Sequence, residues 1–238
     1  MDETERRAME TELQHASKMA MLGRMAAGIA HEIGNPLASI SARLQRLKRK
    51  REPEFIDDTV ELLTSQTDRM TRIVRNVSDL SRIPKVEWTE CDIRKVLYET
   101  VRILQLDRRS KDIEITHHCD DVLLLQGSAD QLQQVFLNIG LNAFDAMPDG
   151  GVLDIAVYET ESEILVEFSD TGEGIDPETQ QKIFDPFFTT KPFGSGMGLG
   201  LWLSHEHVSV HGGQIEAESN DTGGGLFRIR LPRVQTED

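Results

Sequence analysis

The sequence predicts a two-part protein of the α + α/β class, in which an antiparallel helical hairpin precedes an α/β sandwich. Over the first third of the chain, apolar residues recur every three or four positions, which is the period of one face of a helix. Beyond Pro84, apolar runs of strand length alternate with windows of helical period. The chain has 238 residues, enough for two small domains, so the change of pattern predicts a boundary near residues 83–87.

The hairpin is predicted by two apolar stripes on either side of the polar segment KRKREPE. In both stripes the gaps are of three and four residues, close to a heptad repeat. The first stripe comprises Leu22, Ala26, Ile29, Ile33, Leu37, Ile40, Leu44 and Leu47, and the second comprises Ile56, Val60, Leu63, Thr67, Met70, Val74, Val77 and Leu80. A single hairpin cannot bury both stripes, so we expect two chains to form a dimeric four-helix bundle. A plain coiled-coil linker would produce the same stripes.

The second part is expected to alternate strands and helices. Strand-like runs lie at 113–116, 122–125, 152–158 and 163–170, and the segments QIEAES and GLFRIRLP are two further candidates. Helical windows lie at 92–107, 129–147, 176–183 and 198–211. This mixture predicts an α/β domain after the hairpin.

Composition and charge exclude several classes of protein. No run approaches the roughly 18 to 20 apolar residues that span a bilayer, and the start MDETERRAMETEL is too charged for a secretory signal, so we expect a soluble, cytosolic chain. Lysine and arginine number 14 against 13 acidic residues in 1–84, but 12 against 28 in 85–238, so the second part should repel nucleic acid. Cys91 and Cys119 lack the spacing of a metal or redox site and are expected to be packing residues.

One histidine projects away from the first stripe. His31 lies two positions from the stripe residues on either side, about 200° around the helix, so its imidazole is expected to face solvent. Glu32 and Asn35 can share one exposed patch with it. Pro36 removes a backbone hydrogen bond inside the helix, which predicts a helix able to bend near Gly34 and Pro36. Taken alone, the histidine and glutamate could be a simple solvated pair.

A helical window and a strand end together suggest a nucleotide site. Asn138, Asn142 and Asp145 are spaced i, i+4 and i+7, so they share one helix face. Amide oxygens suit a hard cation and amide hydrogens suit phosphate oxygens, so this face could hold Mg-ATP. The segment DTGEGI follows a strand and delivers Asp170 to a turn where glycines allow a close approach to a ligand. Its carboxylate can accept the adenine amino group.

The Gly-rich segment GSGMGLG opens the last predicted helix and leaves backbone N–H groups free for phosphates, with Lys191 before it as a cation. Its spacing is similar to a dinucleotide motif, but such a motif follows a strand directly, and here a proline-bearing segment precedes it. The chain has no GxxxxGK[ST] P-loop either. His205, His207 and His211 could suggest a metal site, but they lie on this same helix and we expect no metal there.

The motifs HEIGNPL, NIGLNA, DTGEGI, FDPFFTTK and GSGMGLGL occur in this order, and over roughly residues 15–232 the sequence resembles the two-domain core of sensor histidine kinases. The resemblance implies a Bergerat-type ATP-binding fold, shared with gyrase, heat-shock chaperones and mismatch-repair proteins. It implies a coiled-coil connector from a missing sensor at 1–15, a dimerisation and histidine phosphotransfer domain at 16–84 and a catalytic ATP-binding domain at 85–238.

The resemblance also implies roles for the residues of the first motif. His31 would be the nucleophile that receives the γ-phosphoryl group of ATP, and Glu32 the base that orients its imidazole. Asn35 would act mainly in removing phosphate from a partner. The group would then pass to an aspartate of a response regulator receiver domain on another chain, and the same protein would also act as a phosphatase of that regulator.

In the second domain the resemblance implies binding of ATP and Mg²⁺. Asn138 would ligate the metal, Asn142 would contact the phosphates and Asp170 would read adenine. The further nucleotide-binding residues are Asp145, Gly172, Gly174, Ile175, Lys191, Gly196, Gly198, Leu199 and Gly200, of which those between 184 and 200 would form a flexible lid. Asp145 and Gly34 depart from the family pattern, because many members carry basic residues at both positions. An acid at 145 could instead hold a magnesium-bound water.

Two rival functions remain open on the sequence. One is an ATPase of the same superfamily that uses ATP to clamp a dimer, although such proteins lack a phosphoacceptor helix with the HExxN pattern. The other is a dimeric signalling scaffold that has lost its activity, against which the intact Asn138, Asp170 and Gly-rich segment argue. For the histidine kinase interpretation, the expected partners are a second copy of the chain and a response regulator, with no nucleic acid and no membrane contact from this segment.

Overall fold

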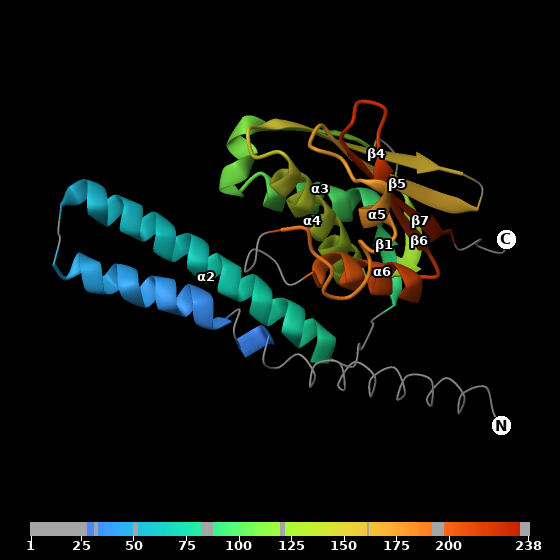
Figure 1. Cartoon of the computed structure of the whole chain (residues 1–238). Coiled ribbons are helices and arrows are strands. Elements are labelled where there is room, and N and C mark those ends of the chain that lie inside the picture. Colours follow the sequence, from blue (N-terminus) through green and yellow to red (C-terminus); the bar gives the residue numbers. More distant parts are fainter. Residues whose placement is uncertain are drawn as a thin grey trace, which may run out of the picture. The chain divides into compact units, whose positions relative to one another are not determined.

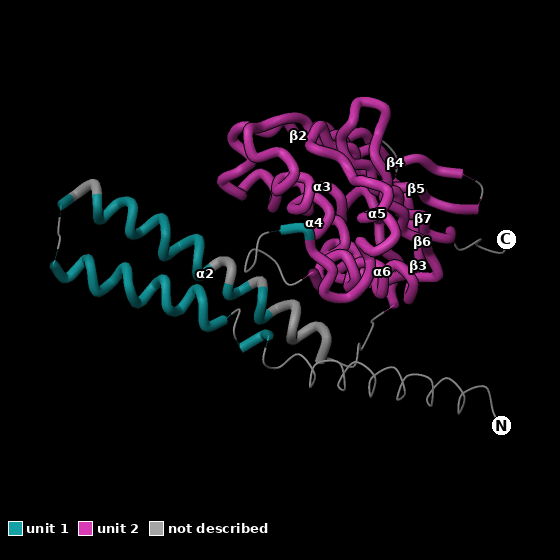
Figure 2. The backbone as a smooth tube through the Cα atoms, viewed as in Figure 1, with its two compact units in different colours: residues 1–84, 190–197 teal, residues 85–189, 198–238 magenta. Residues whose placement is uncertain are grey.

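The computed structural model describes residues 28–30, 33–49, 52–81, 88–119, 122–160, 162–191 and 198–233 (Figure 1). The chain divides into two compact units, Met1–Pro84 with Thr190–Met197 and Lys85–Thr189 with Gly198–Asp238 (Figure 2). We refer to them as the helical unit and the sheet unit.

The helical unit contains two antiparallel helices, one over residues 33–47 and the other, α2, from Pro53 to Ser81 (Figure 1). Arg43 fixes their register near the turn, since its Nε donates to Thr59 Oγ1 at 3.2 Å and its guanidinium lies 4.4 Å from the ring centroid of Phe55. Thr59 is 1% exposed and donates in turn to the Phe55 carbonyl at 2.6 Å. The predicted hairpin is therefore confirmed over the described residues.

Several members of the predicted stripes remain at the surface of the single chain. Among the described residues of the helical unit, the large apolar side chains with the greatest exposure are Leu37 (47%), Leu44 (42%), Ile56 (38%), Val60 (55%) and Val74 (52%). All five belong to the two stripes. The predicted connector at 1–15 and the stripe before residue 28 lie outside the described residues.

The sheet unit is built on a five-stranded sheet in the order β2-β4-β5-β7-β6. Its strands are β2 (Ile113–His118), β4 (Gly151–Glu159), β5 (Glu163–Asp170), β6 (Gln214–Ser219) and β7 (Gly225–Pro232). β2 and β4 pair in parallel, and the other neighbours are antiparallel. A separate antiparallel pair joins β1 (Thr89–Asp92) to β3 (Leu124–Gly127).

Three helices bury their apolar faces against this sheet: α3 (Ile93–Leu104), α4 (Ala129–Ala146) and α6 (Gly200–Val210). Side-chain caps set where two of them, α3 and α4, begin. Asp92 caps α3 by accepting from the Arg94 N–H at 3.0 Å, and Ser128 is the N-cap of α4. The core is made of side chains from these helices and of alternate residues of the strands, so one face of the sheet is covered.

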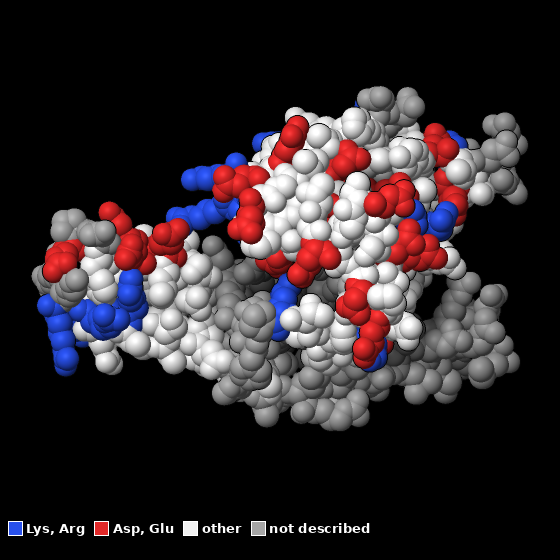
Figure 3. All heavy atoms as spheres, turned by 45° about the horizontal axis from the view of Figure 1, so that its top comes forward, with Lys and Arg blue, Asp and Glu red and all other residues white. Residues whose placement is uncertain are grey.

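Strand β5 shows this alternation most plainly. Ile164, Val166 and Phe168 are buried on the covered face, and Asp170 at the end of the strand shares their parity and is 3% exposed. On the opposite face Glu167 accepts from Arg228 Nε of β7 at 2.7 Å. The surface of the sheet unit is rich in acidic side chains, as the face drawn in Figure 3 shows.

The predicted elements are found with some differences at their ends. The window 92–107 becomes α3, which ends at Leu104 and is followed by a 3-10 helix, η1 (Arg108–Asp112). The window 176–183 contains only one helical turn, α5 (Pro177–Gln180), and the predicted strand at 122–125 lies at 124–127. β1 was not expected. The α + α/β fold class is confirmed.

Candidate nucleotide-binding site

Asn138 joins the middle of α4 to the first turn of α6. Its Nδ2 donates to the Gly200 carbonyl at 3.2 Å and to Ser204 Oγ at 3.3 Å, and Ser204 Oγ donates to the same carbonyl at 2.9 Å. Because both partners accept, the amide must present its nitrogen to α6 and turn its oxygen the other way. Among the described residues, none donates to Asn138 Oδ1, so this oxygen can serve as a metal ligand.

The asparagine face continues towards the C-terminal end of α4. Asn142 lies one turn after Asn138, and Asp145 follows within the next turn. Asp145 forms an ion pair with Arg109 of η1, and Arg109 also donates to Asp107 from Nε at 2.9 Å and from Nη2 at 2.8 Å. The hydrogen bond with Asp107 raises the pKa of Arg109, although burial opposes it. The acidic side chain at 145 therefore faces a cation from another element.

Asp170 is held at the end of β5 by backbone amides. Its Oδ1 accepts from the Gly172 N–H at 2.8 Å and from the Gly225 N–H at 3.0 Å. None of the described residues donates to the other oxygen, Oδ2. A carboxylate that is 3% exposed and keeps one oxygen without a donor suits a ligand that brings its own N–H group.

The glycines of the turn after Asp170 are required by close contacts. A Cβ at Gly172 would lie 2.6 Å from the Ala146 carbonyl oxygen at the end of α4. Gly174 has φ +72°, and a Cβ there would lie 2.4 Å from the Gly223 carbonyl oxygen. Ile175 closes the turn, with its N–H donating to Ser219 Oγ at 2.9 Å.

The turn between β6 and β7 contributes a residue that the sequence did not point to. Asn220 Nδ2 donates to the Asp170 carbonyl at 2.8 Å and to Ser169 Oγ at 2.9 Å, 50 and 51 residues away along the chain. No spacing rule connects positions so far apart. The run of glycines that follows, TGGG, was the available signal for a close approach of two backbones.

One hydrogen bond joins the beginning of the predicted lid, residues 184–200, to its end. The Phe187 N–H donates to the Gly198 carbonyl at 2.8 Å, and Gly198 has φ +63°. Leu199 is 1% exposed and is the N-cap of α6, but it has no side-chain acceptor, so the first amides of α6 lack a side-chain cap. Lys191 is among the described residues, whereas Gly196 lies outside them.

The first motif is only partly described. His31 and Glu32 lie outside the described residues. Asn35 is half-buried and lies in the helix over residues 33–47, as does Pro36. Their predicted roles remain predictions.

The three histidines of α6 and its C-cap have different surroundings in the structure. His211 Nε2 accepts from the Ser128 N–H at 2.9 Å, and its Nδ1 donates to the His207 carbonyl at 2.7 Å, so both ring nitrogens are engaged. His205 lies against Phe184, with ring centroids 5.7 Å apart. Within the described ranges, no group of three or more His, Cys, Asp or Glu residues could hold a metal ion.

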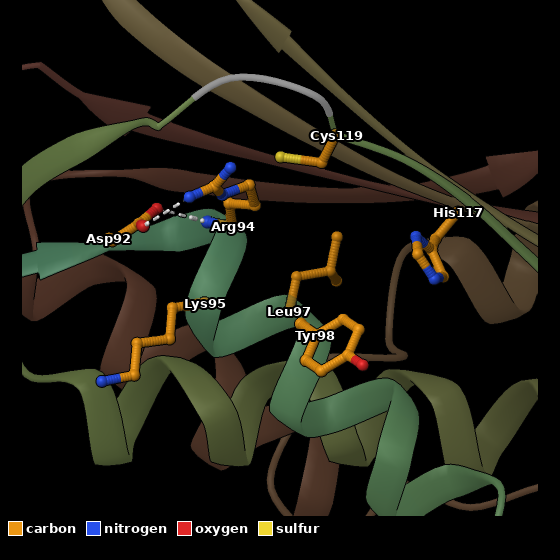
Figure 4. Close-up of a pocket in the computed structure, with 7 residues that line it drawn as sticks. All are labelled: Asp92, Arg94, Lys95, Leu97, Tyr98, His117 and Cys119. Atoms are coloured by element: carbon orange, nitrogen blue, oxygen red, sulfur yellow. Dashed lines mark hydrogen bonds and ion pairs between the residues drawn. The ribbon is translucent and has the colours of Figure 1, made fainter.

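A hollow of about 380 Å³ lies elsewhere in the sheet unit, between the start of α3 and the end of β2 (Figure 4). Tyr98 and His117 meet there edge to face, with ring centroids 6.5 Å apart, and Arg94 is paired with Asp92 at 3.7 Å. None of the predicted nucleotide-binding residues lines this hollow. It is therefore separate from the candidate site.

Two family models match the chain. Residues 21–85 match the His Kinase A (phospho-acceptor) domain, and residues 127–235 match the histidine kinase-, DNA gyrase B- and HSP90-like ATPase. His31 lies in the first match, and Asn138, Asp170 and Asn220 lie in the second. No helix within the described ranges is long and apolar enough to cross a membrane.

Several kinases align with nearly the whole chain. The sensor histidine kinase ZraS of Escherichia coli K12 is 31% identical over 95% of this chain, and sporulation kinase A of Bacillus subtilis is 33% identical over 98% of it. The chain spans about half of the former relative, 49%, and 38% of the latter.

A solved structure of a histidine kinase has the same fold. The crystal structure of the histidine kinase ThkA in complex with the response regulator protein TrrA aligns with 100% of this chain and 70% of its own, with a TM-score of 0.80 and 26% identity. The two matched domains, the named relatives and this structure agree with the fold described above. The chain therefore belongs to the sensor histidine kinase family.

Proposed function

We propose that this chain is the catalytic core of a sensor histidine kinase, in which the sheet unit binds Mg-ATP and His31 receives the γ-phosphoryl group. The observation that carries the proposal is the presence, in one chain, of a phosphoacceptor match at 21–85 and an ATPase match at 127–235. We assign a connector to 1–15, the dimerisation and phosphotransfer domain to 16–84 and the catalytic domain to 85–238.

Asp170 is proposed to recognise adenine. Its Oδ1 is already occupied by two backbone N–H groups, at 2.8 Å and 3.0 Å, which leaves Oδ2 to accept the adenine amino group. The same two bonds stop the carboxylate from rotating, so little ordering is needed when the base binds. Gly172, Gly174 and Ile175 shape the turn beside it.

The phosphates are proposed to lie along the asparagine face of α4 and the start of α6. Asn138 Oδ1 would ligate Mg²⁺, which neutralises phosphate charge when bound, and Asn142 would donate to a phosphate oxygen. The first amides of α6, after Gly198 and Leu199, can donate to the same group because no side chain caps them. Lys191, Gly196 and Gly200 complete the proposed lid.

Asp145 is proposed to act with Arg109 at this end of the site. The guanidinium has five N–H donors, of which two go to Asp107 and one to Asp145. Donors therefore remain for a phosphate or ribose oxygen.

Transfer to His31 uses the ordinary chemistry of an imidazole. A histidine with a pKa near 6.5 is largely neutral at cytosolic pH and has a nucleophilic nitrogen. That nitrogen forms a bond to the γ-phosphorus while the bond to the bridging oxygen breaks, and ADP leaves with the electron pair. Glu32 would accept a hydrogen bond from the other ring nitrogen and stabilise the positive charge that develops.

A homodimer is proposed because the described part of the helical unit includes five large apolar residues of the predicted stripes that are 38% to 55% exposed. A second hairpin would cover them in a four-helix bundle.

The partner that receives the phosphoryl group is proposed to be a response regulator, in line with the solved complex of ThkA with the response regulator protein TrrA. We place this catalytic core in the cytoplasm.

The kinase proposal is tested by incubating the full chain with Mg²⁺ and ATP labelled at the γ-phosphate. We expect the parent to acquire label that is lost in acid and stable in alkali, as for a phosphorus–nitrogen bond. His31→Gln should bind ATP like the parent but acquire no label. A parent that binds ATP without being labelled would reduce the chain to a nucleotide-binding dimer.

Phosphatase activity is proposed from the Glu32 to Asn35 spacing. Asn35→Ala should slow the dephosphorylation of a phosphorylated regulator by about tenfold or more, as expected for the loss of a group that positions the attacking water. Autophosphorylation of the same variant should stay within about threefold of the parent. Equal dephosphorylation rates in parent and variant would remove Asn35 from this role.

A further inference from the structure

The turn between β6 and β7 is tied to the end of β5 by one side chain. Asn220 Nδ2 donates to the carbonyl of Asp170 at 2.8 Å, to Ser169 Oγ at 2.9 Å and to the carbonyl of Gly225 at 3.3 Å. Nδ2 has two hydrogens for three acceptors, so the longest of these bonds is the weakest.

The oxygen of the same amide organises the turn itself. Asn220 Oδ1 accepts from the N–H of Thr222 at 3.1 Å, from Thr222 Oγ1 at 2.8 Å and from the N–H of Gly224 at 2.8 Å. All the donors lie on one side of the amide and the carbonyl acceptors on the other, which fixes its orientation. Asn220 is therefore a two-sided link, with the turn on its oxygen and β5 on its nitrogen.

The link brings the backbone of the turn into direct contact with Asp170. A Cβ at Gly224 would lie 1.9 Å from the Asp170 carbonyl oxygen, and a Cβ at Gly225 would lie 2.7 Å from Asp170 Oδ2. At this distance the Gly225 N–H reaches Asp170 Oδ1 at 3.0 Å. One of the two bonds that orient the carboxylate thus depends on where the turn is held.

Ser219, the residue before Asn220, holds the far end of the loop 170–175. Ser219 Oγ accepts from the N–H of Ile175 at 2.9 Å and donates to its carbonyl at 3.0 Å. The segment 170–175 is therefore fixed at both ends by adjacent residues of the β6–β7 hairpin.

We propose that Asn220 is a positioning residue for adenine recognition, which sets the direction of Asp170 Oδ2 through Gly225 and the Asp170 backbone. The inference rests on the proposed function, in which Oδ2 accepts the 6-amino group of the base. Asn220 does not touch the nucleotide. Its contribution is selectivity for a purine that carries an amino group at position 6.

Two variants separate this role from the folding of the turn. Asn220→Asp keeps an oxygen for the two N–H groups and the hydroxyl of the turn, but it places a second oxygen against the carbonyls of Asp170 and Gly225. Asn220→Ala removes both sides of the link. Thr222→Ala is the matched control, because it removes one bond to Asn220 Oδ1 and leaves the bond to Asp170 in place.

The probes are ADP and purine riboside 5′-diphosphate, which lacks only the 6-amino group, each with Mg²⁺ and measured by calorimetry on the full chain. Neither can phosphorylate His31. We expect the parent and Thr222→Ala to prefer ADP by about tenfold or more, as for a hydrogen bond to a charged group. In both Asn220 variants we expect this preference to fall about fivefold or more through weaker ADP binding, while the analogue binds within about twofold of the parent.

The added charge of Asn220→Asp would by itself attract an amino donor and so strengthen the preference for ADP. A lower preference for ADP in this variant therefore reports a change in the direction of the Asp170 carboxylate. An unchanged preference in either folded variant, or an equal loss for both probes, would overturn the inference. Variants that no longer fold would overturn it too, in favour of a purely structural role. A parent that binds neither probe would contradict the proposed function, whereas a parent that prefers ADP and keeps this preference in the variants contradicts only the role of Asn220.

Discussion

In the folded chain, Asp145 is paired with a cation that its own helix does not supply. Its helix carries no basic residue, yet the carboxylate meets Arg109, which comes from η1, 36 residues earlier in the sequence. Arg109 also lies over the ring of Phe144, with its guanidinium carbon 5.7 Å from the centroid. The charge of the acid is thus balanced by another element. The spacing within α4 could place Asp145 on the asparagine face but could not reveal this partner.

His211 is the buried titratable residue that links α6 to the start of α4. With Nδ1 donating to the His207 carbonyl and Nε2 accepting from the Ser128 N–H, the ring must be neutral, because a protonated ring has no acceptor. Burial lowers the pKa of His211 from its ordinary value near 6.5, and the bond to the His207 carbonyl opposes this only in part. Protonation therefore costs the folded state more than the unfolded state.

The sheet unit should lose stability as the pH falls below about 6.5, because the unfolded chain then binds a proton at position 211 that the folded chain resists. Above this pH both forms are neutral and the contribution is complete. Each pH unit below it can remove up to about 1.4 kcal/mol for that proton. Urea unfolding followed by tryptophan fluorescence reports on this unit alone, because both tryptophans, Trp88 and Trp202, belong to it.

His211→Gln is the variant for this measurement, since glutamine can still donate and accept but does not titrate. We expect the free energy of unfolding to change less between pH 7 and pH 5 in the variant than in the parent. Parallel pH profiles would show that His211 does not carry the dependence.

At the scale of elements, the sequence predicts what local patterns control. Helices α3, α4 and α6 and strands β2, β4, β5, β6 and β7 all lie within or close to their predicted windows. β1 was missed because TECD has no alternation of its own and becomes a strand only by pairing with β3, which begins 32 residues after the end of β1. The end of α3 was placed too late, because Asp107 starts a new 3-10 helix by capping the Arg109 N–H at 3.0 Å. The role of Asn220 was missed for the same reason as β1, since its partners are distant in the chain.

The base of the lid offers a test of backbone strain with a matched control. Gly198 and Gly223 both have positive φ, +63° and +90°, but a Cβ at Gly198 would lie 2.3 Å from the Phe188 carbonyl oxygen, whereas a Cβ at Gly223 would meet nothing within 4 Å. Gly223→Ala should therefore lose only about 1 to 2 kcal/mol of unfolding free energy, the cost of the left-handed conformation. Gly198→Ala should lose a further 1 to 3 kcal/mol or so from overpacking.

Urea unfolding by tryptophan fluorescence measures both glycine variants. ADP affinity should also fall in Gly198→Ala, because the methyl group displaces the Phe187 to Gly198 hydrogen bond at 2.8 Å that joins the lid ends. Equal losses of stability in the two variants would mean that the lid base yields freely to the added methyl group.

At the scale of the whole molecule, the proposed dimer depends on the exposed stripes. Val60 is 55% exposed in the single chain and would face the partner hairpin. Val60→Glu would bury an unpaired charge there, so we expect the chain to sediment as a monomer at micromolar concentration while the parent sediments as a dimer. Ser65→Glu adds the same charge off the stripe and should leave the dimer intact. A dimeric Val60→Glu variant would require an interface elsewhere.

The alternation along β5 has a consequence for how the site can change over time. Asp170 has the same parity as Ile164, Val166 and Phe168, so the carboxylate and the core residues are carried by one pleat. Insertion or deletion of one residue at the start of this strand, before Ile164, would turn three apolar side chains towards water together with the acid. We therefore expect this strand to accumulate substitutions but not insertions or deletions. The position of the acid is then preserved together with the hydrophobic core.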